Sequence, residues 1–116
     1  MKFTIAREIE FVPEWNGNKE SDEPIKFILK YLTGPERDEI INIAFDAEGK
    51  VSVKPNFVKA CRTGIKKIEG LTVDGKSVTT ANEFLGLPGF DDLYHELGNQ
   101  IMTMNPIKDD NLKNSG

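Results

Sequence analysis

Residues 57–104 decide the fold, and they read FVKACRTGIKKIEGLTVDGKSVTTANEFLGLPGFDDLYHELGNQIMTM. Their pattern predicts four elements in this order: a helix over Phe57–Ile68, a tight hairpin over Leu71–Val78, a capped helical turn over Thr80–Leu85 and a longer helix over Phe90–Met104. Each junction carries its own turn or cap residues. The order of these elements is therefore better defined by the sequence than their exact ends.

The first of these helices is predicted from one apolar face. Its members recur at helical spacing: Phe57, Val58, Cys61, Ile65 and Ile68. Asn56 precedes them as a residue type that caps helix N-termini. Gly64 costs about 1 kcal/mol relative to alanine inside a helix. It therefore indicates either close packing or an early end of the helix.

The two junctions that follow have specific local signatures. Asp74-Gly75 between short apolar segments favours a two-residue type I′ turn. Thr80 and Glu83 form a capping-box pattern at the start of the short helical turn. The last helix is predicted to be amphipathic because apolar residues recur every three or four positions: Phe90, Leu93, Tyr94, Leu97, Ile101 and Met104.

The N-terminal part is predicted to contain strands. Apolar residues alternate over Phe3–Phe11, and a second strand is predicted over Ile25–Leu32. Thr33 and Glu36 match a capping box that opens a short helix. Residues 14–24 are polar and predicted to form a mobile loop. Trp15 lies inside this loop, where it either folds back onto the core or is available to a partner.

Residues 40–53 allow two interpretations. Ile40, Ile41, Ala44 and Phe45 would fit a continuing helix, whereas alternate β-branched and aromatic residues fit two strands joined around residues 47–49. We prefer the hairpin because β-branched residues are concentrated in both predicted strands.

The whole chain has 116 residues, which fits one domain. The predicted fold class is α+β: a small single domain with N-terminal strands and hairpins, and three to four helices with the longest at the C-terminus. Residues 1–104 form this domain, and residues 105–116 are expected to be a flexible tail.

Composition restricts the classes of function. The formal net charge of −4 argues against general nucleic-acid binding. The single cysteine, Cys61, excludes an internal disulfide and a cysteine-based zinc site. No apolar signal-peptide core or run long enough to cross a bilayer is found, so we expect a soluble intracellular protein without membrane partners.

No motif predicts a catalytic, cofactor or metal site, so we do not expect an enzyme. His95 lies off the apolar stripe and is expected at the surface. Asp91 and Asp92 in the first turn of the last helix complement its dipole, and with Glu96 they lack the spacing of a calcium loop. Cys61 shares the apolar face of its helix and is expected to be a buried small hydrophobe.

Two features point to partners. A basic run without acids could bind an anion, although a solvated helix face is favoured; its members are Lys50, Lys54, Lys59, Arg62, Lys66 and Lys67. Met102 and Met104 give the last helix an adaptable apolar end. With Trp15, they are the residues predicted to bind a protein partner or to mediate self-association.

The order of the motifs resembles a known family. The segments that carry the resemblance are FVPEWNGN at residues 11–18, TGPER at 33–37, IEGL at 68–71, DGK at 74–76, TTANEFL at 79–85 and PGF at 88–90, followed by the amphipathic helix and a KNS tail at 113–115. In this respect the chain is similar to the tail assembly chaperones of tailed bacteriophages and prophages. The resemblance spans most of the chain but consists of turns and caps.

The resemblance implies a non-catalytic role in phage tail assembly in the cytoplasm of a bacterial host. Such chaperones bind the long tape measure protein and cover its apolar helices until tail-tube subunits replace them. The expected function is therefore an ATP-independent chaperone with no cofactor, acting as an oligomer. One alternative is a structural tail component, such as a tail completion or adaptor protein. The other is a small nucleic-acid-binding regulator.

Overall fold

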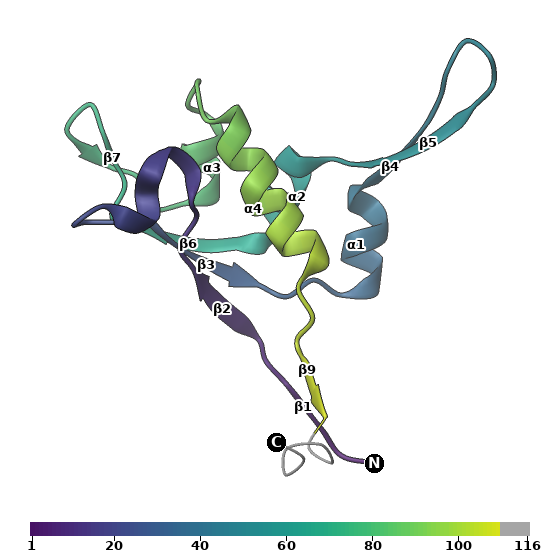
Figure 1. Ribbon diagram of the computed structural model, residues 1–116, viewed down its shortest axis with the longest axis horizontal. Helices are drawn as coiled ribbons and strands as arrows, with labels where there is room; N and C mark the ends of the chain where they lie inside the picture. The colour runs from purple at the N-terminus through teal and green to yellow at the C-terminus, as the bar shows by residue number, and fades with distance from the viewer. Residues whose placement is uncertain (110–116) are drawn as a thin grey trace.

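Three antiparallel strands form the centre of the computed structural model, which describes residues 1–109 (Figure 1). The strand order is β2 (Glu8–Phe11), β3 (Lys26–Lys30), β6 (Ile65–Glu69). Phe27 and Leu29 of β3 are fully buried because alternate side chains of a strand point to one face, and here that face meets the helices. Strands and helices together make a small α+β domain, as predicted.

The longest helix, α4 (Asp91–Thr103), packs across α2 (Phe57–Gly64), and both cover this sheet (Figure 1). The short helix α3 (Ala81–Leu85) completes the core and buries Phe84. Capping boxes open α3 at Thr80 and α1 (Gly34–Ile40) at Thr33, while the side chain of Asn56 caps α2. All three predicted N-caps are confirmed.

The first predicted helix ends earlier than its apolar periodicity indicated. The prediction of a helix over Phe57–Ile68 is wrong beyond Gly64, where the chain enters β6. A Cβ at Gly64 would lie 2.8 Å from side-chain atoms of Ile101, so close packing and an early helix end coincide at this residue. Ile65 and Ile68 are buried as predicted, but as strand residues paired with β3.

The predicted strand over Phe3–Phe11 is in fact two strands with different partners. β1 (Phe3–Ile5) leaves the sheet and pairs with β9 (Ile107–Asp109), whereas β2 pairs with β3. The tail predicted from residue 105 therefore contains a strand, β9, and residues 110–116 of that tail lie outside the described residues. The alternation of apolar residues runs through both strands, so it carries no signal for the change of partner.

The predicted loop over residues 14–24 contains a kinked 3₁₀ helix, η1 (Trp15–Glu20). Asn18 is buried, and its side-chain amide donates to the carbonyl oxygens of Pro13 and Ile25, at 3.0 Å each. Its carbonyl oxygen accepts from the Ile25 amide at 2.7 Å. These bonds join the two ends of the segment, and the predicted mobility of the loop stays a prediction.

The hairpin of β7 (Thr72–Val73) and β8 (Lys76–Ser77) is confirmed. Asp74 and Gly75 have φ values of 53° and 78°, as a type I′ turn requires.

We expect Gly75→Val to lower the free energy of unfolding by more than about 1 kcal/mol, because a β-branched residue is strained at positive φ. Gly75→Asn is the matched control, since asparagine tolerates this conformation. Chemical denaturation measures both variants, and an unchanged midpoint for the valine variant would contradict the turn assignment.

Residues 41–55 form the preferred hairpin and not a continuing helix. β4 (Ile41–Phe45) pairs with β5 (Val51–Pro55), and we call this hairpin, with its turn at residues 46–50, the arm. The arm projects away from the sheet and helices (Figure 1). The radius of gyration is 16.7 Å, against about 13 Å for a compact domain near this size. Projecting segments account for that excess.

Candidate functional site

The three residues predicted to bind a partner are packed against the core. Trp15 is half-buried with its ring 5.5 Å from that of Phe90, and Glu96 accepts hydrogen bonds from the amides of Glu14 and Trp15, at 2.6 and 3.0 Å. Trp15 thus folds back onto the domain. Met102 and Met104 are also half-buried against the core. Their role in partner binding stays a prediction.

Among the large apolar side chains of the helices and strands, those with the highest exposed fractions lie instead on the arm. Its register places Ile41 opposite Pro55, Ile43 opposite Val53 and Phe45 opposite Val51. Because directly paired residues share a face, these six form one side of the ribbon, which we call the apolar face. The exposed fractions of its four outer members are 64% for Ile43, 70% for Phe45, 59% for Val51 and 61% for Val53.

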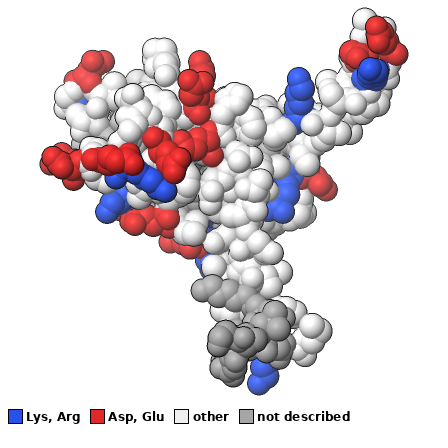
Figure 2. Space-filling model, in the orientation of Figure 1, with Lys and Arg blue, Asp and Glu red and all other residues white. Residues whose placement is uncertain are grey.

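The opposite side of the arm carries small or polar side chains, and we call it the polar side. It carries Asn42, Ala44, Ser52 and Lys54. The two strands of the arm are almost free of charged side chains, and the charged residues lie mainly in the turn at its tip (Figure 2). An uncharged face beside a polar one is the pattern of a strand pair with one face covered. Within residues 1–109, nothing covers the outer part of this face.

Local hydrogen bonds define the arm at both ends. At the tip, the Asp46 carboxylate accepts from the amides of Glu48 and Lys50, at 2.9 and 2.8 Å. At the base, the Asn56 amide donates to the Ile40 carbonyl oxygen at 2.8 Å. A two-stranded ribbon is only marginally stable in water by itself. The arm therefore gains stability when its apolar face is covered.

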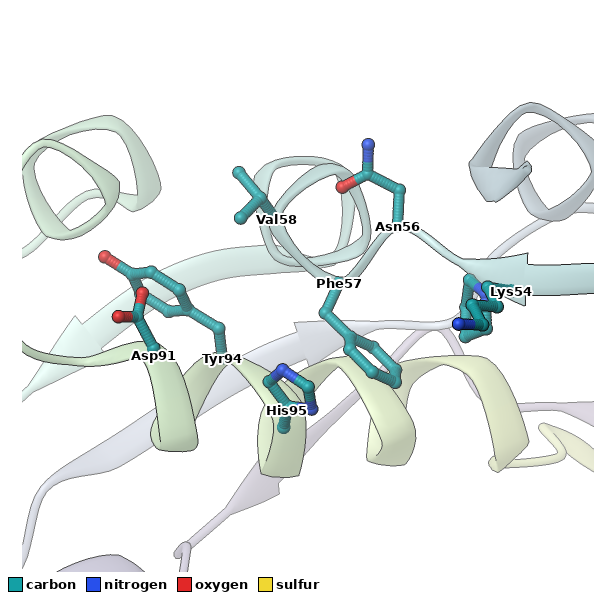
Figure 3. Close-up of a pocket in the computed structure, with 8 residues that line it drawn as sticks. Lys54, Asn56, Phe57, Val58, Asp91, Tyr94 and His95 are labelled. Carbon is teal, nitrogen blue, oxygen red and sulfur yellow. The ribbon is translucent and has the colours of Figure 1, made fainter. Parts of the chain in front are cut away.

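A pocket of about 480 Å³ opens at the base of the arm (Figure 3). Pro55 belongs both to the apolar face and to this pocket, so the two surfaces are continuous. Phe57 and His95 form one wall, with ring centroids 4.7 Å apart. Lys54 and Asp91 add one charge of each sign. Apolar walls with few polar groups are typical of a site that receives an apolar group.

The terminal strands form a second, smaller projecting ribbon (Figure 1). Phe3, Ile5 and Ile107 are each about half exposed on it. Phe3 and Ile5 alternate along β1, and Ile107 pairs with Ile5, so all three share one face. Residues 1–109 therefore present two apolar ribbons, of which the arm is the longer.

The basic run does not form one surface in the structure. Lys50 is at the tip of the arm and Lys54 at its base, whereas Lys59 and Arg62 lie on α2. Lys67 on β6 forms an ion pair with Glu69 at 3.4 Å. The run is thus divided among three elements, which weakens the case for an anionic partner.

The predicted burial of Cys61 is confirmed. The side chain is fully buried, its Sγ lies 3.7 Å from the carbonyl oxygen of Tyr94, and burial raises the pKa of the thiol to about 12. Because the thiolate is the nucleophile, the folded protein holds the unreactive form at neutral pH.

We expect a maleimide reagent to label native Cys61 slowly between pH 7 and 9, with little increase over this range. The unfolded chain should react rapidly, and faster as pH rises towards the ordinary thiol pKa of about 8.5. Absorbance assays with and without denaturant compare the two states. Equal native and unfolded rates would contradict burial of the thiol.

Residues 1–109 contain no group of three or more His, Cys, Asp or Glu side chains that could hold a metal ion. Exposed His95 contacts Phe57, and Glu96 is engaged by the amides before η1. Among the helices of this described part, none combines the length and apolar character needed to cross a membrane.

Sequence reasoning found the arm but not its role. The alternation in residues 41–45 and 51–55 predicts a strand pair with one apolar face. Whether that face is buried depends on where the rest of the chain lies. No family model matches the chain, and neither curated proteins nor solved structures gave a match.

Proposed function

We propose that the protein is a non-catalytic, ATP-independent assembly chaperone that holds an apolar helical client on the apolar face of the arm. The observation that carries this proposal is a projecting ribbon with four large apolar side chains each more than half exposed. Exposed apolar surface of this kind is typical of a protein interaction site. The resemblance described above suggests tail assembly in a tailed phage or prophage, with the tape measure protein as client in the bacterial cytoplasm.

The size of the apolar face suits a reversible contact. Full burial of one such side chain is worth about 1.5–3 kcal/mol, so covering four that are about two-thirds exposed yields on the order of 4–8 kcal/mol. Association itself costs about 4–15 kcal/mol. A single arm therefore binds weakly, and several copies along one long client would add avidity. A chaperone that must later be displaced needs this weak, repeated contact.

Co-expression with the tape measure protein of the same gene cluster tests the proposal. The wild-type protein is expected to keep this client soluble and to co-purify with it. Phe45→Ser should abolish both effects, whereas Ala44→Ser, on the opposite face of the same strand, should preserve them. If the wild-type protein neither binds nor solubilises the tape measure, the chaperone proposal fails.

A structural tail component is the second candidate, and one observation favours it. The arm and the β1–β9 ribbon project from different parts of the molecule, so one subunit could contact two neighbours (Figure 1). Mass spectrometry of purified virions separates the two functions. A stoichiometric amount in the particle supports the structural role, and absence supports the chaperone.

For the third candidate, a nucleic-acid-binding regulator, we expect no specific complex with DNA or RNA. The basic side chains are dispersed, and the formal net charge is −4. Binding measured by fluorescence anisotropy should stay weaker than roughly micromolar at physiological salt. A tighter, salt-dependent complex that is lost in Lys59→Glu and Lys66→Glu would contradict this expectation and support the regulator.

A further inference from the structure

We propose that residues 14–17, which we call the flap, open and close as a unit of their own, and that the Glu96 carboxylate holds them closed on α4. In the closed state Trp15 packs on Phe90. In the open state the indole ring leaves Phe90 and enters water, while the sheet and the helices stay folded. The inference depends neither on the arm nor on the chaperone function.

The flap lies between two fixed points of the chain. On one side Pro13 is fully buried. On the other side Asn18 is buried, and its side chain bonds to the backbone of Pro13 and Ile25 at 2.7–3.0 Å. These three bonds close the segment on itself and do not involve the flap. The flap can therefore move while its two ends stay in place.

The flap has a local structure that can move as one piece. The Gly17 amide donates to the Glu14 carbonyl oxygen at 3.1 Å, which makes residues 14–17 a turn with its own hydrogen bond. Asn16 and Gly17 have φ values of 54° and 72°, and this kink divides the flap from the rest of η1. Rotation at the kink and after Pro13 would swing the turn outward.

Glu96 fixes the flap to the rest of the fold. In the described chain, hydrogen bonds from outside residues 13–25 reach the flap only from this side chain. One carboxylate oxygen accepts from the Glu14 amide at 2.6 Å, and the other accepts from the Trp15 amide at 3.0 Å. Hydrogen bonds to an ionised acceptor are about twice as strong as neutral ones. Loss of this one carboxylate should therefore release the flap.

The contact of Trp15 with Phe90 holds the flap less firmly. The ring centroids are 5.5 Å apart, and Trp15 remains half-buried. Within residues 1–109 its indole N–H has no hydrogen-bond partner, whereas a tryptophan buried in a core usually finds one. Apolar contact alone is left to keep the ring in place once Glu96 lets go.

The charges beside Glu96 oppose the closed state. Asp92 lies one turn earlier on α4, and like charges at this spacing repel. Glu14 brings a further negative charge with the flap. Its ion pair with Lys19, at 3.5 Å, joins two exposed side chains and contributes little. The two amide bonds to Glu96 therefore decide whether the flap stays closed.

Amide hydrogen exchange followed by NMR tests this role of Glu96. Glu96→Gln keeps the shape of the side chain but leaves one acceptor oxygen for two amides. Exchange at the amides of Glu14 and Trp15 should accelerate about tenfold. The Ile25 amide, which donates to Asn18 in the same segment, should exchange as in the wild-type protein.

Asp92→Asn is the matched control, because it removes the same charge from α4 at a side chain that makes no hydrogen bond to the flap. It should leave exchange at both flap amides unchanged. Equal exchange in the wild-type protein, Glu96→Gln and Asp92→Asn would overturn the proposal.

Fluorescence measures the open state directly, because Trp15 is the only tryptophan of the chain. In Glu96→Gln, quenching by acrylamide should rise and the emission should shift to longer wavelengths. Labelling of buried Cys61 by maleimide should stay slow, which verifies that the core is folded. If Cys61 and the Ile25 amide become accessible in the same proportion as Trp15, the flap opens only with the whole domain and the proposal fails.

Discussion

Phe84→Ala is expected to lower the free energy of unfolding by about 3–5 kcal/mol, the range for removing a buried aromatic ring. Phe84 is fully buried between three rings, those of Phe27, Phe90 and Tyr94, with centroids 5.1–5.5 Å away. Through its contacts with the rings of Phe27 and Tyr94, it also packs α3 against β3 and α4. A domain of this size has about 5–15 kcal/mol in total, so the variant should be near the limit of folding.

Chemical denaturation monitored by circular dichroism measures this loss. Phe45→Ala is the matched control, since it removes the same ring from a position that is 70% exposed. We expect that control to change stability by less than about 0.5 kcal/mol. Equal effects of the two substitutions would contradict the assignment of Phe84 to the core and of Phe45 to an exposed surface.

Gly98→Leu is expected to destabilise the protein by about 3 kcal/mol, the upper part of the usual range for overpacking. Gly98 lies where α4 crosses α2, and a Cβ there would clash with the Phe57 side chain, whose Cβ and Cγ would both be 2.9 Å away. Phe57 also forms a wall of the pocket at the base of the arm. The substitution should therefore disturb the pocket as well as the helix crossing.

Thermal unfolding of three variants tests this crossing. Gly98→Leu should lower the melting temperature most, and Gly64→Ala should lower it through the similar contact with Ile101. Gly34→Ala is the control, because no atom lies within 4 Å of a Cβ at that position. A Gly98→Leu variant as stable as the control would contradict the close approach of α2 and α4.

Local chemistry was the reliable part of the sequence analysis. The capping boxes at Thr33 and Thr80 and the positive-φ turn at Asp74-Gly75 depend on four or five adjacent residues, and all three are present. The amphipathic last helix was also predicted well, because its apolar stripe extends over more than three turns.

The errors came from contacts between distant parts of the chain. Ile65 and Ile68 fit a helical stripe and a buried strand equally well, and pairing with β3 decided between them. The strand β9 exists because it meets β1 from the other end of the chain. For Trp15 the sequence left two alternatives open, and the contact that decides for packing onto the core is with Phe90, 75 residues away. No window of neighbouring residues contains these partners.

For function, the apolar face of the arm shows most clearly what the sequence pattern could not predict. A pattern of alternating apolar residues predicts that one face of a hairpin will be covered, but not by what. The structure leaves the outer part of this face in water. The partner is therefore to be sought outside the described part of the chain, either in a client or in a second copy.

Site-specific photo-cross-linking tests most directly whether the apolar face of the arm binds protein. A photoreactive phenylalanine analogue is placed at position 45, on the apolar face, or at position 44, on the polar face, in cells that also express the tape measure protein. Position 45 should give products with the mass of a client complex or of a dimer, and position 44 should give neither. Equal products from both positions, or none from position 45, would contradict the assignment of this face as the binding surface.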